Sequence, residues 1–257
     1  MIPVARLGMR SRHDRPLLWA AGATTATAAA GYWLPSAALV SASARRLFGV
    51  RATIASADAV ALTFDDGPHP HGTPAVLAAL ERVGAPATFF LAGEQVERWP
   101  GLAADIAAAG HEVAVHCHAH RNLMWLTPRR VRDDLRRAAA VITRATGRPL
   151  RYYRPPYGIL TTAALSVARQ MGWEVILWLR DGRDWDARET PASIAGRIAR
   201  KLEPGDVVLL HDADHYSAAG SWRRAAAAIE RLDTVLEERN LLVASLDAAA
   251  PTRRGLR

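Results

Sequence analysis

The chain has 257 residues, half of them hydrophobic, which fits one large domain with a sizeable core plus a short appendage and excludes wholesale disorder. The formal charge of +8 is typical of nucleic-acid-binding proteins, but ten of the 33 basic residues and one of the 25 acidic residues lie outside positions 52–252. That leaves 23 basic and 24 acidic residues in a nearly neutral body, so we expect no nucleic-acid partner. The single cysteine, Cys117, excludes an intrachain disulfide.

The amino-terminal region predicts transfer of the body across a membrane. Residues 1–16 carry four arginines, and the uncharged residues 17–40 that follow are long enough to span a bilayer. Basic residues hold the amino end in the cytoplasm, so we expect a single-pass cell-membrane anchor with the catalytic body outside. The alternatives are a signal peptide cleaved at the small residues 42–44, which would give a secreted protein, and a buried helix.

Apolar runs of strand length alternate with helical patterns from residue 59 onward. We expect strands at 60–64, 87–91, 113–115, 151–154, 173–179, 206–210 and 241–245, and helices at 73 onward, 94–109, 127–147, 161–171, 190–202 and 221–239. About seven strands separated by helices predict an α/β fold with a parallel sheet. A linker at 41–57 then precedes one domain at 58–248, and a basic tail occupies 249–257.

Five polar clusters each directly follow a predicted strand. They are Asp65-Asp66, His116 to His120, Arg154 to Gly158, Asp181 to Trp185, and His211-Asp212. In a parallel α/β barrel the carboxyl ends of the strands meet on one face, where active sites are built. We therefore expect the five clusters to share one pocket.

The first two clusters contain the residue types of a metal site. Two adjacent carboxylates can divide metal binding and base catalysis between them, although Asp-Gly is also a common turn. His116 and His120 lie four residues apart after an apolar strand, and imidazoles with a nearby carboxylate suit a catalytic zinc ion that keeps one position open. Cys117 is either a soft fourth ligand or a small buried residue, and the second interpretation is favoured.

The other clusters supply cations, acids and aromatic rings. Arg154 lies in a proline-rich turn, where a permanent cation can stabilise the ionised form of a nearby carboxylate. His211 next to an aspartate can stay protonated and donate to a leaving group. Trp185 is either a core residue or a wall for a sugar ring.

Taken in this order, the motifs resemble those of the polysaccharide deacetylases of the NodB-homology type, carbohydrate esterase family 4. The motifs are TFDDGP at 63–68, H-x-x-x-H at 116–120, RPPYG at 154–158, DGRDW at 181–185 and LLH at 209–211, with ATFFLAG at 87–93 between them. The resemblance covers about residues 58–246. It implies a distorted, TIM-like (β/α) barrel and one divalent metal ion, usually Zn²⁺, with Co²⁺, Ni²⁺ and Mn²⁺ as alternatives because the same ligands accept several ions.

The resemblance also implies a role for each motif residue. Asp66, His116 and His120 correspond to the metal ligands, Asp65 to the general base, Arg154 to its orienting cation, the Tyr157 backbone N–H to an oxyanion donor, His211 to the general acid, Asp184 to the group that tunes it, and Trp185, Tyr157 and Leu209 to substrate contacts. Cys117 departs from the Ser or Thr usual in the family. The implied reaction removes N-acetyl groups from a polysaccharide such as peptidoglycan or a chitin-like glycan.

Three other functions stay open at this point. The chain could be an inactive sugar-binding relative, although every metal and acid–base position holds a competent residue. It could act on another substrate with the same scaffold, such as O-acetylated xylan or a small cyclic amide, because pocket loops rather than motifs decide specificity. A nucleic-acid-binding role is disfavoured by the neutral body.

Overall fold

The computed structural model describes residues 31–247. Most of the predicted anchor and all of the tail at 249–257 therefore lie outside the described residues. Within the described part of the chain, no helix combines the length and the apolar character needed to cross a bilayer.

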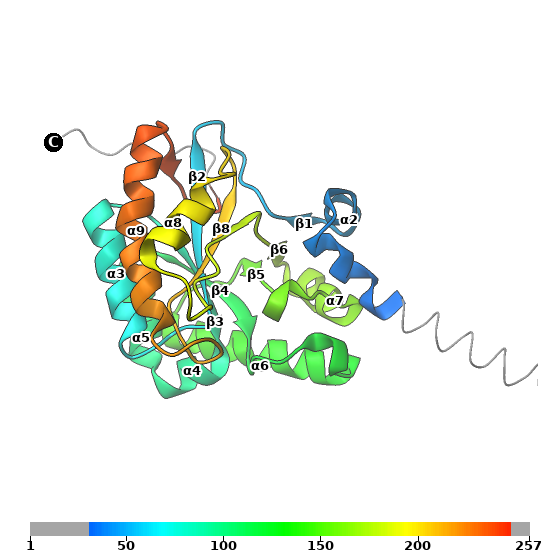
Figure 1. The fold of residues 1–257 in the computed structure, drawn as a ribbon. Coiled ribbons are helices and arrows are strands. Elements are labelled where there is room, and N and C mark those ends of the chain that lie inside the picture. The colour runs from blue at the N-terminus through cyan, green and yellow to red at the C-terminus, as the bar shows by residue number, and fades with distance from the viewer. Residues whose placement is uncertain (1–30, 248–257) are drawn as a thin grey trace, which may run out of the picture.

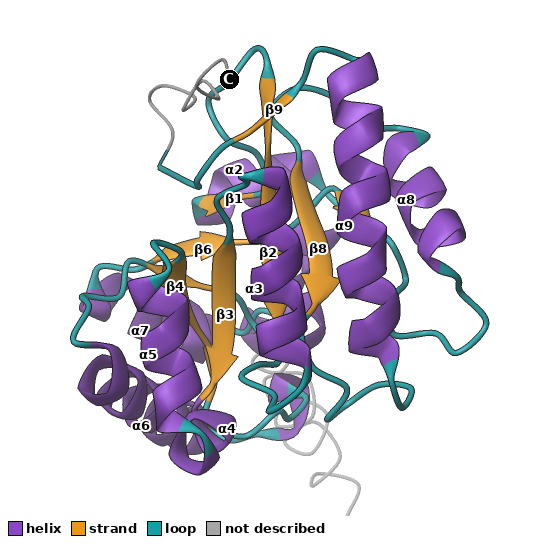
Figure 2. Ribbon diagram, turned by 90° about the vertical axis from the view of Figure 1, so that its left-hand side faces the viewer, coloured by secondary structure: helices purple, strands orange, loops and turns teal. Residues whose placement is uncertain are grey.

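A parallel sheet forms the centre of the molecule. Its strands are β1 (Val50–Arg51), β2 (Ala59–Asp65), β3 (Thr88–Ala92), β4 (Glu112–Cys117), β5 (Tyr152–Tyr153), β6 (Glu174–Ile176), β7 (Arg180–Asp181), β8 (Val207–His211) and β9 (Leu242–Val243). The order is β1-β6-β5-β4-β3-β2-β8-β7, with β9 added beside β2, and every strand pair is parallel. The sheet curls into a distorted half-barrel (Figure 2). Its edge strands are β1 and β7.

Helices cover the outside of this sheet. They are α2 (Ala42–Phe48), α3 (Gly72–Val83), α4 (Gly93–Arg98), α5 (Pro100–Ala108), α6 (Pro128–Thr146), α7 (Thr162–Met171), α8 (Pro191–Ala199) and α9 (Ser221–Glu238), with short 3-10 turns η1 (Leu34–Leu39), η2 (Leu123–Trp125) and η3 (Pro156–Gly158). Helices α3, α9 and α8 pack side by side on one flank, and α4 to α7 cover the other (Figure 1). The α/β class and the parallel sheet are thus confirmed.

Helix boundaries follow the capping residues. The Thr127 side chain accepts the Arg130 N–H before Pro128 opens α6, and Thr190 forms a capping box with Ser193 at α8. Gly147, with a φ of 64°, ends α6 in the left-handed conformation that glycine adopts without strain.

Three expectations about elements differ from the structure. The described residues contain nine strands rather than about seven, because β1 and β7 have two residues each and show no apolar run. The helix expected at 94–109 is two helices separated at Trp99, because Pro100 disfavours a helical residue before it. The stretch expected as a linker, 41–57, contains α2 and β1, and β1 pairs with β6.

Alternation along β2 directs Thr63 and Asp65 into the barrel. Ala59 and Ala61 lie in the core cluster inside the barrel, together with Phe90 and Tyr152, whereas Val60, Leu62 and Phe64 belong to the larger cluster under the helices. Successive side chains of a strand point to opposite faces, so Thr63 and Asp65 continue the inward row. Small alanines deep in the barrel leave the volume above them for polar groups.

Candidate metal centre and active site

The carboxyl ends of the strands converge on one cavity of about 440 Å³. Asp65 on β2 is aligned in register with His211 on β8, which brings residues 146 positions apart in sequence onto neighbouring strand ends. The cavity is lined by Asp65, Asp66, His116, His120, Tyr157, Trp178, Trp185, Leu209, His211, Tyr216 and Ser217. The structure therefore brings residues of all five predicted clusters to its wall, and Arg154 lies directly behind Asp65.

Three side chains converge as a candidate metal centre. One carboxylate oxygen of Asp66, Oδ1, lies 3.4 Å from His116 Nε2 and 3.4 Å from His120 Nε2. Ligands at 2.0–2.1 Å from a tetrahedral zinc ion are roughly 3.3 Å apart, so this spacing suits one ion among the three atoms. Asp66 Oδ1 is buried and has no hydrogen-bond partner among the described residues, which a cation would supply.

The protonation of these groups also suits a cation. Burial lowers the pKa of His120 to about 4, so its ring is neutral near pH 7. Burial opposes ionisation of Asp66, but the neighbouring imidazoles of His116, His211 and His120 lower its pKa to about 2. His116 Nδ1 donates to the Arg154 carbonyl oxygen over 2.8 Å, which leaves the Nε2 lone pair facing Asp66.

The second aspartate, Asp65, is held by a buried arginine instead. Arg154 Nη1 donates to Asp65 Oδ1 over 2.7 Å and to the Thr63 hydroxyl over 2.8 Å. The guanidinium is fully buried, lies 4.1 Å from the Phe90 ring centroid, and also donates to the Ile176 carbonyl. Adjacent carboxylates thus have different partners, one facing imidazoles and one fixed by a cation.

A charged pair lies at the end of β8, the strand next to β2. Asp184 accepts both the ring Nδ1–H of His211, over 3.0 Å, and the His211 backbone N–H, over 2.7 Å. Burial disfavours the imidazolium, but Asp184, with contributions from Asp66 and Asp65, raises the pKa of His211 to about 10. A protonated His211 Nε2 therefore faces the cavity, 4.0 Å from Asp66 Oδ2.

Aromatic and apolar side chains complete the wall. Tyr157 is more than half exposed and has a φ of 58°, a left-handed conformation that is rare for a bulky residue and recurs at functional sites. The Trp185 ring meets His211 edge-on at 5.5 Å. Leu209 and Trp178 are also on the wall, so the three predicted substrate contacts Tyr157, Trp185 and Leu209 share one cavity.

Two further aromatic residues, Trp178 and Tyr216, line the cavity without having been predicted from the sequence. The Tyr216 ring stacks on His120 with centroids 4.4 Å apart, and its hydroxyl donates to Glu94 and accepts from Gln95. Trp178 lies inside the strand expected at 173–179 and Tyr216 lies six residues beyond the one expected at 206–210, so no sequence signal marked either residue. Cys117 is fully buried, and burial raises the pKa of its thiol well above the usual range, which fits a small structural residue.

A second imidazole cluster lies next to the cavity. His69, Asp214 and His215 bring potential ligand atoms within 4.8 Å of one another. His69 Nδ1 accepts the backbone N–H groups of His71 and Gly72, so the proton of the neutral ring is on Nε2, which faces Asp214 at 3.2 Å. A metal would need that Nε2 lone pair, so we interpret the cluster as a hydrogen-bonded support of the loop.

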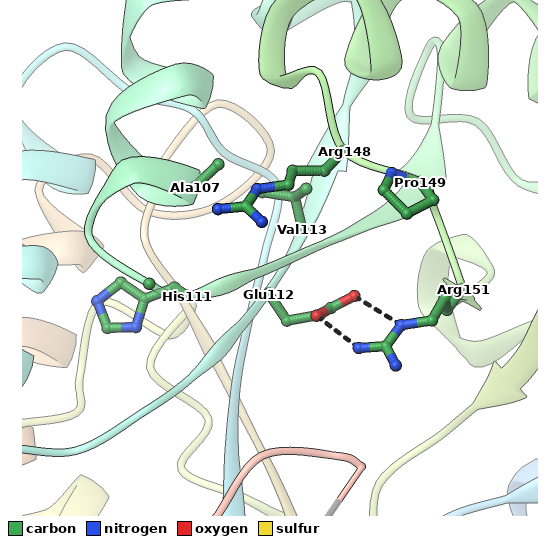
Figure 3. Close-up of a pocket in the computed structure, with 8 residues that line it drawn as sticks. Ala107, His111, Glu112, Val113, Arg148, Pro149 and Arg151 are labelled. Carbon is green, nitrogen blue, oxygen red and sulfur yellow. Dashed lines mark hydrogen bonds and ion pairs between the residues drawn. The ribbon is translucent and has the colours of Figure 1, made fainter.

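Another cavity, of about 300 Å³, lies at the amino end of β4 (Figure 3). Its main charged groups, Glu112 and Arg151, bind each other through two contacts, the shorter being 2.9 Å. The cavity contains none of the predicted site residues, and its carboxylate is neutralised by the arginine. It offers no catalytic arrangement.

Comparison with known proteins agrees with this geometry. The model of the polysaccharide deacetylase family matches residues 53–176. A chitooligosaccharide deacetylase of Bradyrhizobium is 39% identical over 170 residues, covering 65% of this chain and 77% of the relative. A peptidoglycan-N-acetylglucosamine deacetylase of Bacillus cereus is 35% identical over 155 residues, covering 60% and 72%.

Among solved structures, a mutant family 4 pseudoenzyme of Bacillus anthracis with restored enzymatic activity superposes with a TM-score of 0.67. It is 30% identical, and the match covers 74% of this chain and 68% of that one. The chain belongs to the polysaccharide deacetylase family, the carbohydrate esterases of family 4 with a NodB homology domain, and is a hydrolase of that family.

Proposed function

We propose that this protein removes N-acetyl groups from an N-acetylated glycan, with water as co-substrate and acetate and a free amino sugar as products. The observation that carries the proposal is a pair of differently held groups on one cavity wall, beside the candidate metal ligands. Asp65, fixed by Arg154, and His211, fixed by Asp184, end the neighbouring strands β2 and β8.

A divalent ion, with zinc as the favoured species, would be held by Asp66, His116 and His120. When bound, it supplies Lewis-acid polarisation of the acetamide carbonyl and of water. Nitrogen and carboxylate ligands also suit Co²⁺, Ni²⁺ or Mn²⁺, so the donor set favours a class of ions rather than one.

The residues of the chain then divide the proton transfers. Asp65 accepts the proton of the attacking water, and its short contact with Arg154 keeps the carboxylate aimed into the cavity. The Tyr157 backbone N–H stabilises the developing oxyanion. His211 donates its proton to the departing nitrogen, and Asp184 stabilises the imidazolium until that step.

The substrate proposal rests on relatives and on the cavity. The two relatives are named for chitooligosaccharides and for peptidoglycan N-acetylglucosamine, which share the N-acetylglucosamine unit. Trp178, Trp185 and Leu209 offer apolar surface for a sugar ring and an acetyl methyl group. We favour cell-wall glycan, because the arginine-rich amino terminus and the apolar stretch that begins at residue 17 predict transfer of the body across the membrane, either anchored or secreted after cleavage.

Acetate release from purified peptidoglycan, chitooligosaccharide and acetylated xylan, with and without a chelator, tests the function. We expect chelator-sensitive release from one or both N-acetylated substrates. Asp65→Asn should lower kcat by about 10²–10⁴-fold while metal binding persists, because it removes the base and leaves the ligands. Asp58→Asn, an exposed change, is the control.

Two outcomes would contradict the proposal. Release from acetylated xylan alone would make the enzyme an O-acetyl esterase. No release from any substrate by the metal-loaded protein would favour the inactive relative, a class that exists in this family.

A further inference from the structure

The segment that precedes the family match packs against the catalytic loops. Residues 31–40, drawn in blue beside α7 in Figure 1, contain η1 and lie before the match at 53–176. Ala38 and Pro35 of this segment are buried, so it belongs to the folded body. We expected these residues to be part of a membrane span.

One set of contacts fixes the loop after β5, which carries Tyr157. A Cβ placed on Gly158 would lie 2.6 Å from Leu39 Cδ1, so the Leu39 side chain rests directly on the Gly158 backbone. Gly158 has a φ of 69°, and Tyr157 before it is also left-handed. Two residues further on, the Leu160 carbonyl accepts the Ser36 hydroxyl over 2.8 Å.

A second set of contacts fixes the loop after His120. The Tyr32 hydroxyl donates to the Leu126 carbonyl over 2.9 Å, and the Trp33 ring N–H donates to the Met124 carbonyl over 3.3 Å. The two braced loops meet inside the cavity, where the rings of His120 and Tyr157 are 4.7 Å apart. The segment therefore ties together the chain behind a candidate metal ligand and behind the candidate oxyanion donor.

We propose that residues 31–40 are a brace of the active site and that Leu39 is a positioning residue for Tyr157. The two left-handed residues of the Tyr157 loop are strained or entropically costly on their own, so an outside contact is needed to keep the backbone N–H aimed into the cavity. The functional unit then begins near residue 31 rather than at 58. The catalytic part of this inference rests on the proposed function.

The test compares Leu39→Ala with Val40→Ala in the full-length protein. Leu39 packs on Gly158, whereas the neighbouring Val40 is 86% exposed. We expect Leu39→Ala to lower kcat about 10- to 100-fold, the scale of a small displacement of a catalytic group, with KM and metal affinity near wild type. Leu39→Met, which keeps a large apolar side chain, should have a kcat near wild type, and Val40→Ala should leave kcat unchanged.

Hydrogen exchange gives a readout that does not depend on deacetylation. The Gly158 and Ile159 N–H groups bond to the Pro155 and Pro156 carbonyls, and their exchange should accelerate in Leu39→Ala while exchange in β2 stays unchanged. If Leu39→Ala does not fold, Ser36→Ala carries the same test with a smaller effect. Wild-type kcat together with wild-type exchange in a folded Leu39→Ala protein would overturn the brace. A Leu39→Met protein that loses as much kcat as Leu39→Ala would overturn it as well. An inactive wild type with faster loop exchange in Leu39→Ala would contradict the deacetylase function alone.

Discussion

His120 is held by aromatic rings rather than by a hydrogen bond. Its Nδ1 is buried and has no partner among the described residues, whereas His116 Nδ1 binds a carbonyl. Metal-bound histidines usually use that second nitrogen to fix the ring. Here Tyr216 stacks on the ring with an interplanar angle of 14°, and Tyr157 meets it edge-on. We infer that stacking orients this ligand.

Two substitutions of Tyr216 distinguish the role of its ring from the role of its hydroxyl. Tyr216→Leu removes the stacked face and should weaken zinc binding about 10- to 100-fold, the range known for groups that support a ligand. Tyr216→Phe keeps the face and should stay near wild type. A competition titration with a chromophoric chelator measures both dissociation constants, with Ser217→Ala, also on the cavity wall, as control. Equal affinity in Tyr216→Leu and wild type would remove the stacking role.

Asp184 sets the upper pH limit that we expect for activity. It raises the pKa of His211 to about 10, so the proton to be donated is present across neutral pH. Asp184→Asn should lower this pKa and move the alkaline limb of the kcat profile to lower pH. Asp186→Asn, which removes a carboxylate bound to Arg188 instead, should not move it. A pH series of kcat for the three proteins measures the shift, and an unmoved limb in Asp184→Asn would contradict the acid assignment.

The Asp184–His211 pair should also make the stability of the fold depend on pH, with the stabilisation falling as the pH rises. A histidine whose pKa is higher in the folded than in the unfolded protein stabilises the fold fully below the unfolded value, about 6.5. That stabilisation is lost as the pH rises toward about 10. The Tm difference between wild type and Asp184→Asn should therefore be largest near pH 6 and shrink toward pH 10. A Tm difference that grows with pH would contradict the raised pKa of His211.

At the level of elements, the turn after β2 depends on a close approach of the Gly67 backbone to the Asp212 side chain. A Cβ on Gly67 would lie 2.3 Å from Asp212 Oδ2, and Asp212 is fully buried, where its carboxylate accepts the Thr73 hydroxyl. The turn is thereby pressed against the chain that leaves β8. Asp66, with a φ of 78°, directly precedes this contact. The direction of the Asp66 side chain therefore depends on the turn.

Gly67→Ala should therefore damage the site through the backbone. We expect a loss of about 1–3 kcal/mol in the free energy of unfolding from overpacking, with a larger fall in metal affinity because Asp66 moves. Gly101→Ala in α5 has open space and should be neutral or slightly stabilising. Denaturant unfolding and a zinc titration check both variants, and wild-type metal affinity in Gly67→Ala would show that Asp66 does not depend on this turn.

The long elements were predictable because each carries a periodic signal. All seven residues of β2 are buried under helices and barrel core, and such a strand reads as a continuous apolar run. Two-residue strands such as β1 and β7 have no run to detect, and they form because neighbouring strands offer free edges. The packing of η1 was hidden for another reason: an apolar stretch after arginines has the composition of a membrane span as well as of a core segment.

For the molecule as a whole, the site was predictable because parallel strands place their carboxyl ends at one mouth. Asp66 and His116 are 50 positions apart in sequence, yet strand order alone brings β2 and β4 to either side of β3. The contacts of Trp178 and Tyr216 were not predictable, since they depend on how loops fold back over the mouth rather than on a periodic pattern.

The candidate metal centre joins residues from separate strands, so a bound ion would contribute to the stability of the whole fold. An ion bound to the folded chain alone stabilises it by about 4 kcal/mol at a thousandfold excess over Kd, which for a domain of this size is a rise in Tm of roughly 8–16 °C. A chelator should reverse this rise in wild type and in Asp65→Asn, which keeps the three ligands, but should have no effect on Asp66→Asn. The rise should also vanish on acidification, because His120, with a pKa of about 4, takes up a proton in place of the ion. A zinc-dependent Tm in Asp66→Asn equal to that of wild type would contradict the centre, whatever the activity.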